Sequence, residues 1–217
     1  MQLQTTKVKK MVLLSMMAAI AFTIVALIRI PVVLFLKYEP KDVVITIGGF
    51  LFGPMASLIV SGVVSLIEMV SISETGPIGL IMNMLSTCAF ACTAAFIYKK
   101  KRTMGGAVAG LIAGSVLMTV AMVLWNWLIT PLYMGQPREA IESMLLPVFL
   151  PFNALKAGLN TALTLFLYKP VVNTLRKIHF IETRETHPAQ SKLGIYILSG
   201  VLLITCVVLV LVLNGTI

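Results

Sequence analysis

Uncharged apolar runs of bilayer-spanning length constrain this chain more than any other feature of its sequence. Residues 11–28 and 193–213 contain no Asp, Glu, Lys or Arg, and a membrane-spanning helix needs about 20 predominantly apolar residues. Charged residues make up 12% of the chain and the mean hydropathy is +0.99, whereas soluble domains contain roughly 25% charged residues. The sequence therefore predicts an all-α, polytopic membrane helix bundle and argues against a soluble enzyme.

The number of membrane crossings depends on one long apolar segment. The apolar segments are residues 11–28, 43–73, 78–98, 104–129, 145–168 and 193–213. The second exceeds one ordinary span and contains Gly53-Pro54, where glycine allows a tight reversal and proline interrupts a helix. It is either one long tilted helix or two helices, residues 43–52 and 55–73.

The positions of the basic residues favour two crossings. With two, the basic block at residues 99–102 lies on the same side as Lys7, Lys9 and Lys10, as the positive-inside tendency requires for a cytoplasmic N-terminus. The formal net charge of +9 then reflects orientation in the cell membrane, and no nucleic-acid partner is needed to explain it. We expect a six-helix core at residues 1–178, a cytoplasmic linker at 179–192 and an extra C-terminal transmembrane helix within 193–217.

The chain offers no recognisable catalytic or metal-binding motif. Its three cysteines, Cys88, Cys92 and Cys206, lie in apolar runs without a CxxC pattern, and no HExxH motif or histidine occurs within a predicted helix. We therefore expect no enzymatic activity, no bound metal and no cofactor.

Charged and amide side chains inside predicted helices indicate a binding site. Glu68 and Lys156 are the charges placed well within helices, and such groups are costly in a bilayer. Glu68 either serves a function or reaches the outer interface. The i, i+3, i+7 spacing of Asn153, Lys156 and Asn160 puts them on one helix face. That face should point into the bundle, either to bind a ligand or to bond neighbouring helices.

The remaining polar candidates converge on the outer side. Tyr38 and Glu39 lie in a partly apolar loop, residues 31–42, that is suited to act as a lid, while Asn83 and Asn126 lie near the outer ends of two helices. Asparagine both donates and accepts hydrogen bonds. Together with Lys156 and Asn153 these residues predict a pocket for a planar, hydrogen-bonding solute.

Five segments resemble one family. They are residues 37–42 (KYEPKD), 48–54 (GGFLFGP), 76–83 (GPIGLIMN), 125–133 (WNWLITPLY) and 151–156 (PFNALK). In this order, within about residues 8–178, they resemble the riboflavin-specific substrate-binding (S) component of energy-coupling-factor (ECF) transporters. The resemblance implies six helices, riboflavin as the transported ligand and an outward-opening site. Asn126, Asn153 and Lys156 match residues that such proteins use on the isoalloxazine ring, and Tyr38, Glu39 and Asn83 are further candidates.

The resemblance also implies partners. S components work with a transmembrane coupling protein and two ATPase subunits, and they carry no ATPase motif of their own. Their docking face is an Ala-x-x-x-Ala pattern on the first helix, for which this chain offers Ser15, Ala19 and Thr23. Small residues at this spacing also serve packing within a bundle. An S component for another planar vitamin or nucleobase-like solute is the alternative function, and a stand-alone facilitator or scaffold is a third.

Overall fold

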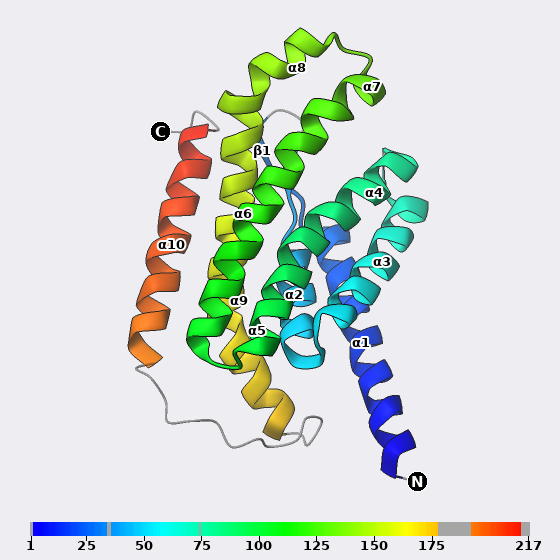
Figure 1. Ribbon diagram of the computed structural model, residues 1–217, viewed down its shortest axis with the longest axis vertical. Coiled ribbons are helices and arrows are strands. Elements are labelled where there is room, and N and C mark those ends of the chain that lie inside the picture. Colours follow the sequence, from blue (N-terminus) through cyan, green and yellow to red (C-terminus); the bar gives the residue numbers. More distant parts are fainter. Residues whose placement is uncertain (1, 34–35, 74, 178–191, 214–217) are drawn as a thin grey trace.

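The computed structural model describes residues 2–33, 36–73, 75–177 and 192–213, which form an elongated bundle of helices (Figure 1). The helices that form the bundle are α1 (Gln2–Leu27), α2 (Lys41–Phe52), α3 (Pro54–Ser71), α4 (Gly76–Thr87), α5 (Thr93–Lys100), α6 (Met104–Leu128), α9 (Leu150–Lys177) and α10 (Lys192–Leu213). A π-helical turn (Cys88–Cys92) joins α4 to α5, and another (Leu145–Phe149) precedes α9. The linker predicted at 179–192 lies, apart from Lys192, outside the described residues.

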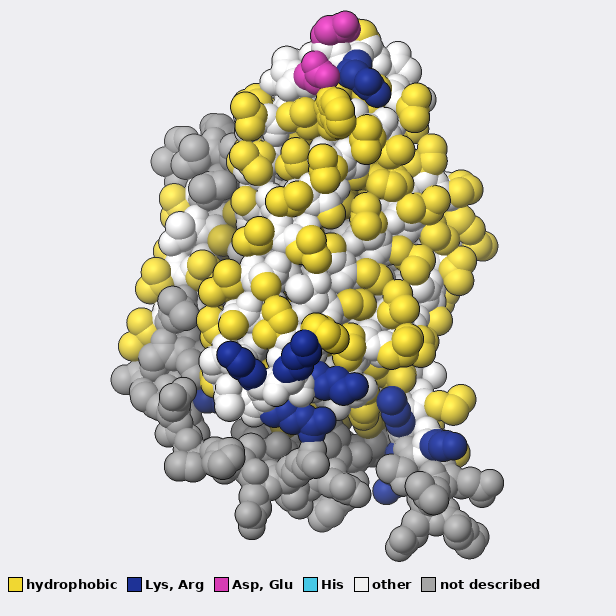
Figure 2. Space-filling model, in the orientation of Figure 1, with side chains coloured by type: hydrophobic (Ala, Val, Ile, Leu, Met, Phe, Trp, Pro, Cys, Tyr) yellow, Lys and Arg dark blue, Asp and Glu magenta, His cyan; other side chains and the backbone are white. Residues whose placement is uncertain are grey.

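Five helical segments of the described chain are long and apolar enough to cross a membrane: Lys7–Leu27, Pro54–Ser71, Gly76–Lys100, Met104–Leu128 and Arg138–Leu175. Apolar side chains cover the visible face of the bundle between its two ends (Figure 2). The sixth expected core crossing, α2, has 12 residues and spans about 18 Å at 1.5 Å per residue, less than the hydrocarbon thickness of a bilayer. The predicted helical bundle is thus confirmed with five candidate spans in the described chain, α2 is shorter than a full span, and a seventh crossing by α10 stays a prediction.

The predicted reversal at Gly53-Pro54 is present. α2 ends at Phe52, Gly53 adopts φ 93°, and α3 begins at Pro54. A positive φ is readily accessible to glycine, and proline suits the first turn of a helix. A Cβ atom at Gly49 would meet the Ser57 hydroxyl and lie 2.8 Å from the Ala95 Cβ. The absence of a side chain at Gly49 therefore lets α2 pack closely against α3 and α5.

The expected first loop is shorter and more ordered than predicted. Residues 30–38 contain an antiparallel pair, β1 (Ile30–Val33) and β2 (Leu36–Tyr38), with an irregular register between Pro31 and Val33. This short hairpin is the one sheet of the described residues in an otherwise all-α fold. The loop was also expected to extend to Asp42, but α2 begins at Lys41, and both Lys41 and Asp42 are buried in its first turn.

Charge separates the two ends of the molecule. The α5–α6 turn, with Lys101 and Arg102, lies at the end that carries the N-terminus, and basic side chains gather there (Figures 1 and 2). The opposite end carries two short helices that the sequence did not predict, α7 (Thr130–Met134) and α8 (Arg138–Met144). This arrangement has the up-and-down order that the two-crossing interpretation requires.

The C-terminal helix α10 packs along α9 (Figure 1). Cys206 is buried there, and a Cβ atom at Gly158 would lie 3.1 Å from its Sγ atom. Cys206 belongs to an apolar cluster that includes Leu155, Leu159 and the hairpin residue Val32. Helix α10 therefore shares a core with the hairpin.

Candidate functional site

A polar cavity of about 180 Å³ lies near the end of the bundle opposite the basic turn. Five of the six predicted substrate-binding residues line it: Glu39, Asn83, Asn126, Asn153 and Lys156. They come from the end of the hairpin and from helices α4, α6 and α9. Residues separated by more than 100 positions in the sequence thus meet around one space.

The two buried amides of the cavity lining, Asn126 and Asn153, keep hydrogen-bonding capacity for a ligand. Asn126 donates to the Met122 carbonyl at 2.8 Å and accepts from the Thr130 hydroxyl at 3.0 Å. Asn153 donates to the Phe149 carbonyl at 2.8 Å. Each amide has two N–H groups and two oxygen lone pairs. The bonds within the helices therefore orient the amides and leave donors and acceptors for the cavity.

Lys156 has a carboxylate partner that the sequence did not reveal. Its Nζ lies 3.7 Å from Asp42 Oδ2. Asp42 was expected in an outer loop, yet it is fully buried in the first turn of α2. A buried ammonium needs such a partner because an unpaired charge is costly to bury. The predicted stripe of Asn153, Lys156 and Asn160 does face the bundle interior.

A second cluster of four charges lies at the cavity, and three of them, Arg29, Glu39 and Glu68, line it. Lys41 Nζ lies 2.6 Å from Glu68 Oε2 and 3.1 Å from Glu39 Oε2. Arg29 bridges the same two carboxylates, at 3.3 Å to Glu39 and 3.5 Å to Glu68. Lys41 is 1% exposed and Glu68 is 4% exposed. The interpretation of Glu68 as a group at the outer interface is therefore wrong, and Lys41, expected in the outer loop, is a buried partner.

Tyr38 is the predicted site residue that the structure does not place in the lining of this cavity. Its side chain is buried and its hydroxyl donates to Asn160 Oδ1 at 3.0 Å. Burial, followed by the nearby Asp42 carboxylate, raises the pKa of the Tyr38 phenol above its usual range. The phenol is therefore a stable neutral donor that supports the wall of the cavity from behind.

Ser86 is a further lining residue that sequence reasoning missed. It lies one helical turn after Asn83 on α4, is 2% exposed and lines the cavity. Within the described part of the chain its Oγ atom has no hydrogen-bond partner. Buried hydroxyls are ordinarily hydrogen-bonded, so this one is suited to a bound ligand. Its i, i+3 spacing from Asn83 puts both residues on one helix face, and this is the sequence signal that could have identified it.

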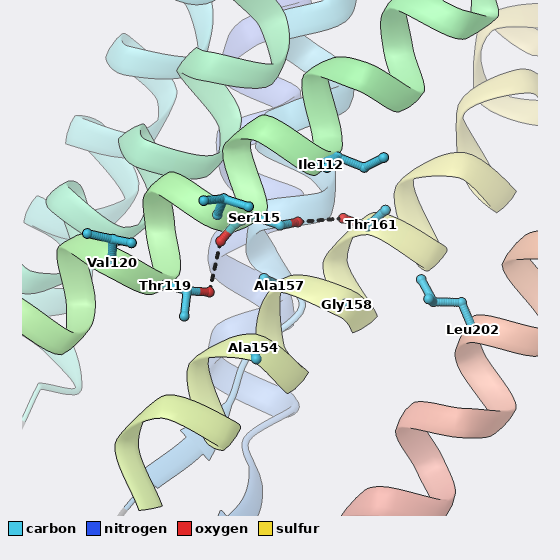
Figure 3. A pocket seen from close by; sticks show the side chains of 10 residues that line it. Ile112, Ser115, Thr119, Val120, Ala154, Ala157, Gly158, Thr161 and Leu202 are labelled. Atoms are coloured by element: carbon cyan, nitrogen blue, oxygen red, sulfur yellow. Dashed lines mark hydrogen bonds between the residues drawn. The ribbon is translucent and has the colours of Figure 1, made fainter. Parts of the chain in front are cut away.

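A larger cavity, of about 430 Å³, lies between α6, α9 and α10 (Figure 3). Its polar side chains already bond to one another or to their own helix: Ser115 with Thr161 at 3.0 Å, and Thr119 to the Ser115 carbonyl at 2.8 Å. The rest of its lining is apolar, including Ile112 and Leu202. A specific site needs a few converging polar groups, so the smaller polar cavity is the better candidate.

The three predicted docking residues lie on the outside of the bundle. Ser15, Ala19 and Thr23 are all exposed on α1, and the Thr23 hydroxyl bonds to the Ala19 carbonyl at 2.9 Å. Their exposure does not fit the alternative of packing within the bundle. It leaves a surface where another helix can approach closely.

Comparisons with known proteins agree with this arrangement. A family model described as "ECF transporter, substrate-specific component" matches residues 9–168. Riboflavin transporter FmnP of Bacillus subtilis is 29% identical over 188 residues, covering 80% of this chain and 98% of its own. Riboflavin transporter RibU of Staphylococcus aureus is 28% identical over 179 residues, covering 78% and 94%.

A solved structure extends the comparison to the fold. It is described as "Structure and mechanism of the S component of a bacterial ECF transporter", with a TM-score of 0.66 and 30% identity over 78% of this chain and 99% of that one. The family is a transporter subunit and not an enzyme. The chain is therefore a multi-pass membrane protein that belongs to the substrate-specific (S) components of ECF transporters.

Proposed function

We propose that this S component binds riboflavin in the polar cavity and supports its uptake. The observation that carries the proposal is the meeting of Asn83, Asn126, Asn153 and Lys156 around one space. The isoalloxazine ring of riboflavin presents an imide edge with alternating acceptors and a donor, which amide side chains can match. The riboflavin transporters that are 28% and 29% identical to this chain support the same ligand.

The charges around the cavity favour an uncharged ligand. Two of the cations of the lining have a carboxylate within 4 Å: Asp42 for Lys156, and Glu39 and Glu68 for Arg29. The neutral ring system of riboflavin therefore meets compensated charges at Lys156 and Arg29. At about 180 Å³ the cavity is smaller than the roughly 300 Å³ of the smallest common ligand pockets. Binding a three-ring solute therefore includes outward movement of lining side chains.

We further propose that the N-terminus is cytoplasmic and that the cavity faces outward. The basic residues 99–102 lie at the same end as the N-terminus, and cytoplasmic segments carry the excess of Lys and Arg. The core at residues 1–178 would then dock on the transmembrane coupling protein, which two ATPase subunits drive. Ser15, Ala19 and Thr23 form the docking stripe, and residues 193–217 add a helix beyond the core.

Titration of ligand-free protein in detergent with riboflavin tests the proposal. Flavin fluorescence should be quenched saturably with one equivalent. Asn153→Ala and Lys156→Ala should each weaken binding about tenfold or more, since a hydrogen bond to a charged or buried group is worth about 1.5–3 kcal/mol. Asn173→Ala is the matched control, because Asn173 is exposed on the same helix, about 30 Å further along.

The titration also separates the alternatives. Unchanged binding in both cavity variants would refute the site. An absence of quenching with wild-type protein, together with saturable binding of another planar vitamin or a nucleobase, would instead favour the alternative substrate. Uptake by cells that lack the coupling module would favour a stand-alone facilitator.

A further inference from the structure

The carboxylate of Asp42 lies directly behind the polar cavity without lining it. Asp42 is fully buried. Its Oδ1 accepts a hydrogen bond from Thr87 at 2.7 Å, and its Oδ2 accepts one from Asn160 Nδ2 at 3.1 Å. The same Oδ2 lies 3.7 Å from Lys156 Nζ. One carboxylate thus joins α2, α4 and α9 at the back of the site.

The hydrogen bonds fix the direction of this carboxylate. Thr87 holds one oxygen from α4, and Asn160 holds the other from α9. Tyr38 donates to Asn160 Oδ1 at 3.0 Å, so the amide group of Asn160 turns its N–H toward Asp42. A carboxylate bound at both oxygens cannot rotate away from Lys156.

Lys156 needs such a fixed partner because its side chain is flexible. A lysine carries a compact charge on a four-carbon stem with several rotatable bonds. The Lys156 side chain is 11% exposed, at the wall of the cavity. At 3.7 Å from Asp42 Oδ2 the ammonium forms an ion pair and not a hydrogen bond, so its three N–H donors stay available to a ligand.

We propose that Asp42 is a positioning residue for the substrate: its charge holds the Lys156 ammonium at the cavity wall so that the N–H donors of Lys156 meet a ring acceptor of the ligand. The proposal rests on the proposed function. The competing explanation is that Asp42 only stabilises the start of α2, where a negative charge is favourable. The two explanations differ in whether Asp42→Asn changes the affinity for riboflavin in a protein that already lacks the Lys156 ammonium.

A double-mutant cycle tests the coupling. Riboflavin Kd is measured by fluorescence quenching for wild type, Asp42→Asn, Lys156→Gln and the double variant, each with its ligand-free thermal unfolding. We expect each single variant to weaken binding about tenfold or more. The double variant should be no more than about threefold weaker than the weaker single variant, because coupled effects are not additive. It should also regain thermal stability, since both charges have been removed together.

Thr87 supplies a milder test should Asp42→Asn fail to fold. Thr87→Val removes the hydroxyl that holds Asp42 Oδ1 and keeps the side-chain shape, while Thr87→Ser keeps the hydroxyl. We expect several-fold weaker binding for Thr87→Val and binding close to wild type for Thr87→Ser. Equal affinities of the two Thr87 variants would overturn the proposal.

The outcomes of the cycle separate this proposal from the proposed function. Wild-type protein that does not bind riboflavin refutes the function itself. Wild-type binding with an unchanged Kd in Asp42→Asn overturns the positioning role and leaves the function intact. Effects of Asp42→Asn and Lys156→Gln that multiply in the double variant also overturn it, because they would show that Asp42 acts independently of Lys156.

Discussion

Removal of the Lys41 ammonium should destabilise the ligand-free protein strongly. Lys41 is 1% exposed and contacts two carboxylates, at 2.6 Å to Glu68 and 3.1 Å to Glu39. Breaking a buried ion pair by removing one partner costs about 3–5 kcal/mol. Arg29 still bridges both carboxylates, so Lys41→Met leaves one uncompensated negative charge and not two. We therefore expect the lower value, about 3 kcal/mol or a roughly 150-fold smaller folding constant.

The matched variants separate charge from packing. Lys41→Met combined with Glu68→Gln removes one charge of each sign and should recover to within about 1 kcal/mol of wild type, because replacing both partners of a buried pair is often neutral. Lys101→Met removes an exposed lysine and should change stability by no more than about 0.5 kcal/mol.

Loss of helical circular dichroism during titration with a denaturing detergent measures these differences. A Lys41→Met variant within 1 kcal/mol of wild type would refute the reasoning. A double variant less stable than Lys41→Met alone would refute it equally.

Three further substitutions test other features. Ser86→Ala should weaken riboflavin binding several-fold while leaving ligand-free thermal stability unchanged or higher. The control is Thr164→Val, which also removes a buried hydroxyl without a partner in the described chain but lies outside the cavity lining; it should leave binding unchanged. Equal affinities of the two variants would contradict this prediction. Ala19→Leu should abolish cellular riboflavin uptake with the complete transporter but preserve binding in detergent, and normal uptake would remove the docking stripe from consideration. Gly158→Leu should push α10 from α9, because even a Cβ atom there lies 3.1 Å from Cys206 Sγ; with the other two cysteines replaced, maleimide should label Cys206 several-fold faster, and an unchanged rate would contradict the packing of α10.

Much of the helical framework follows from local sequence. Apolar run length and the Gly53-Pro54 interruption predict the helices and the reversal between α2 and α3, because both depend on residues close together in the chain. The interior direction of Asn153 and Asn160 follows equally from helix periodicity and the cost of exposing amides to lipid.

The buried charges could not be predicted in the same way. Lys41 and Asp42 follow a proline and precede an apolar run, which is also the pattern of a solvated loop end. Their burial depends on Glu68, Thr87 and Asn160, which lie 27, 45 and 118 residues away. No local pattern contains those partners, so only the assembled bundle shows that the loop ends before Lys41.

The shortness of α2 has a consequence for how the protein enters the membrane during synthesis. Its 12 residues begin with Lys41 and Asp42, and a charge placed at the centre of an inserting helix costs about 2.5–3.5 kcal/mol. Alone, α2 is too short and too polar at its start to partition into lipid. It must therefore enter together with α3 as a helical hairpin turned at Gly53, with Glu68 of α3 already available to Lys41. Asp42 has its partners on α4 and α9, so its charge is compensated only after those later helices have entered, and the back of the proposed binding site forms late in insertion.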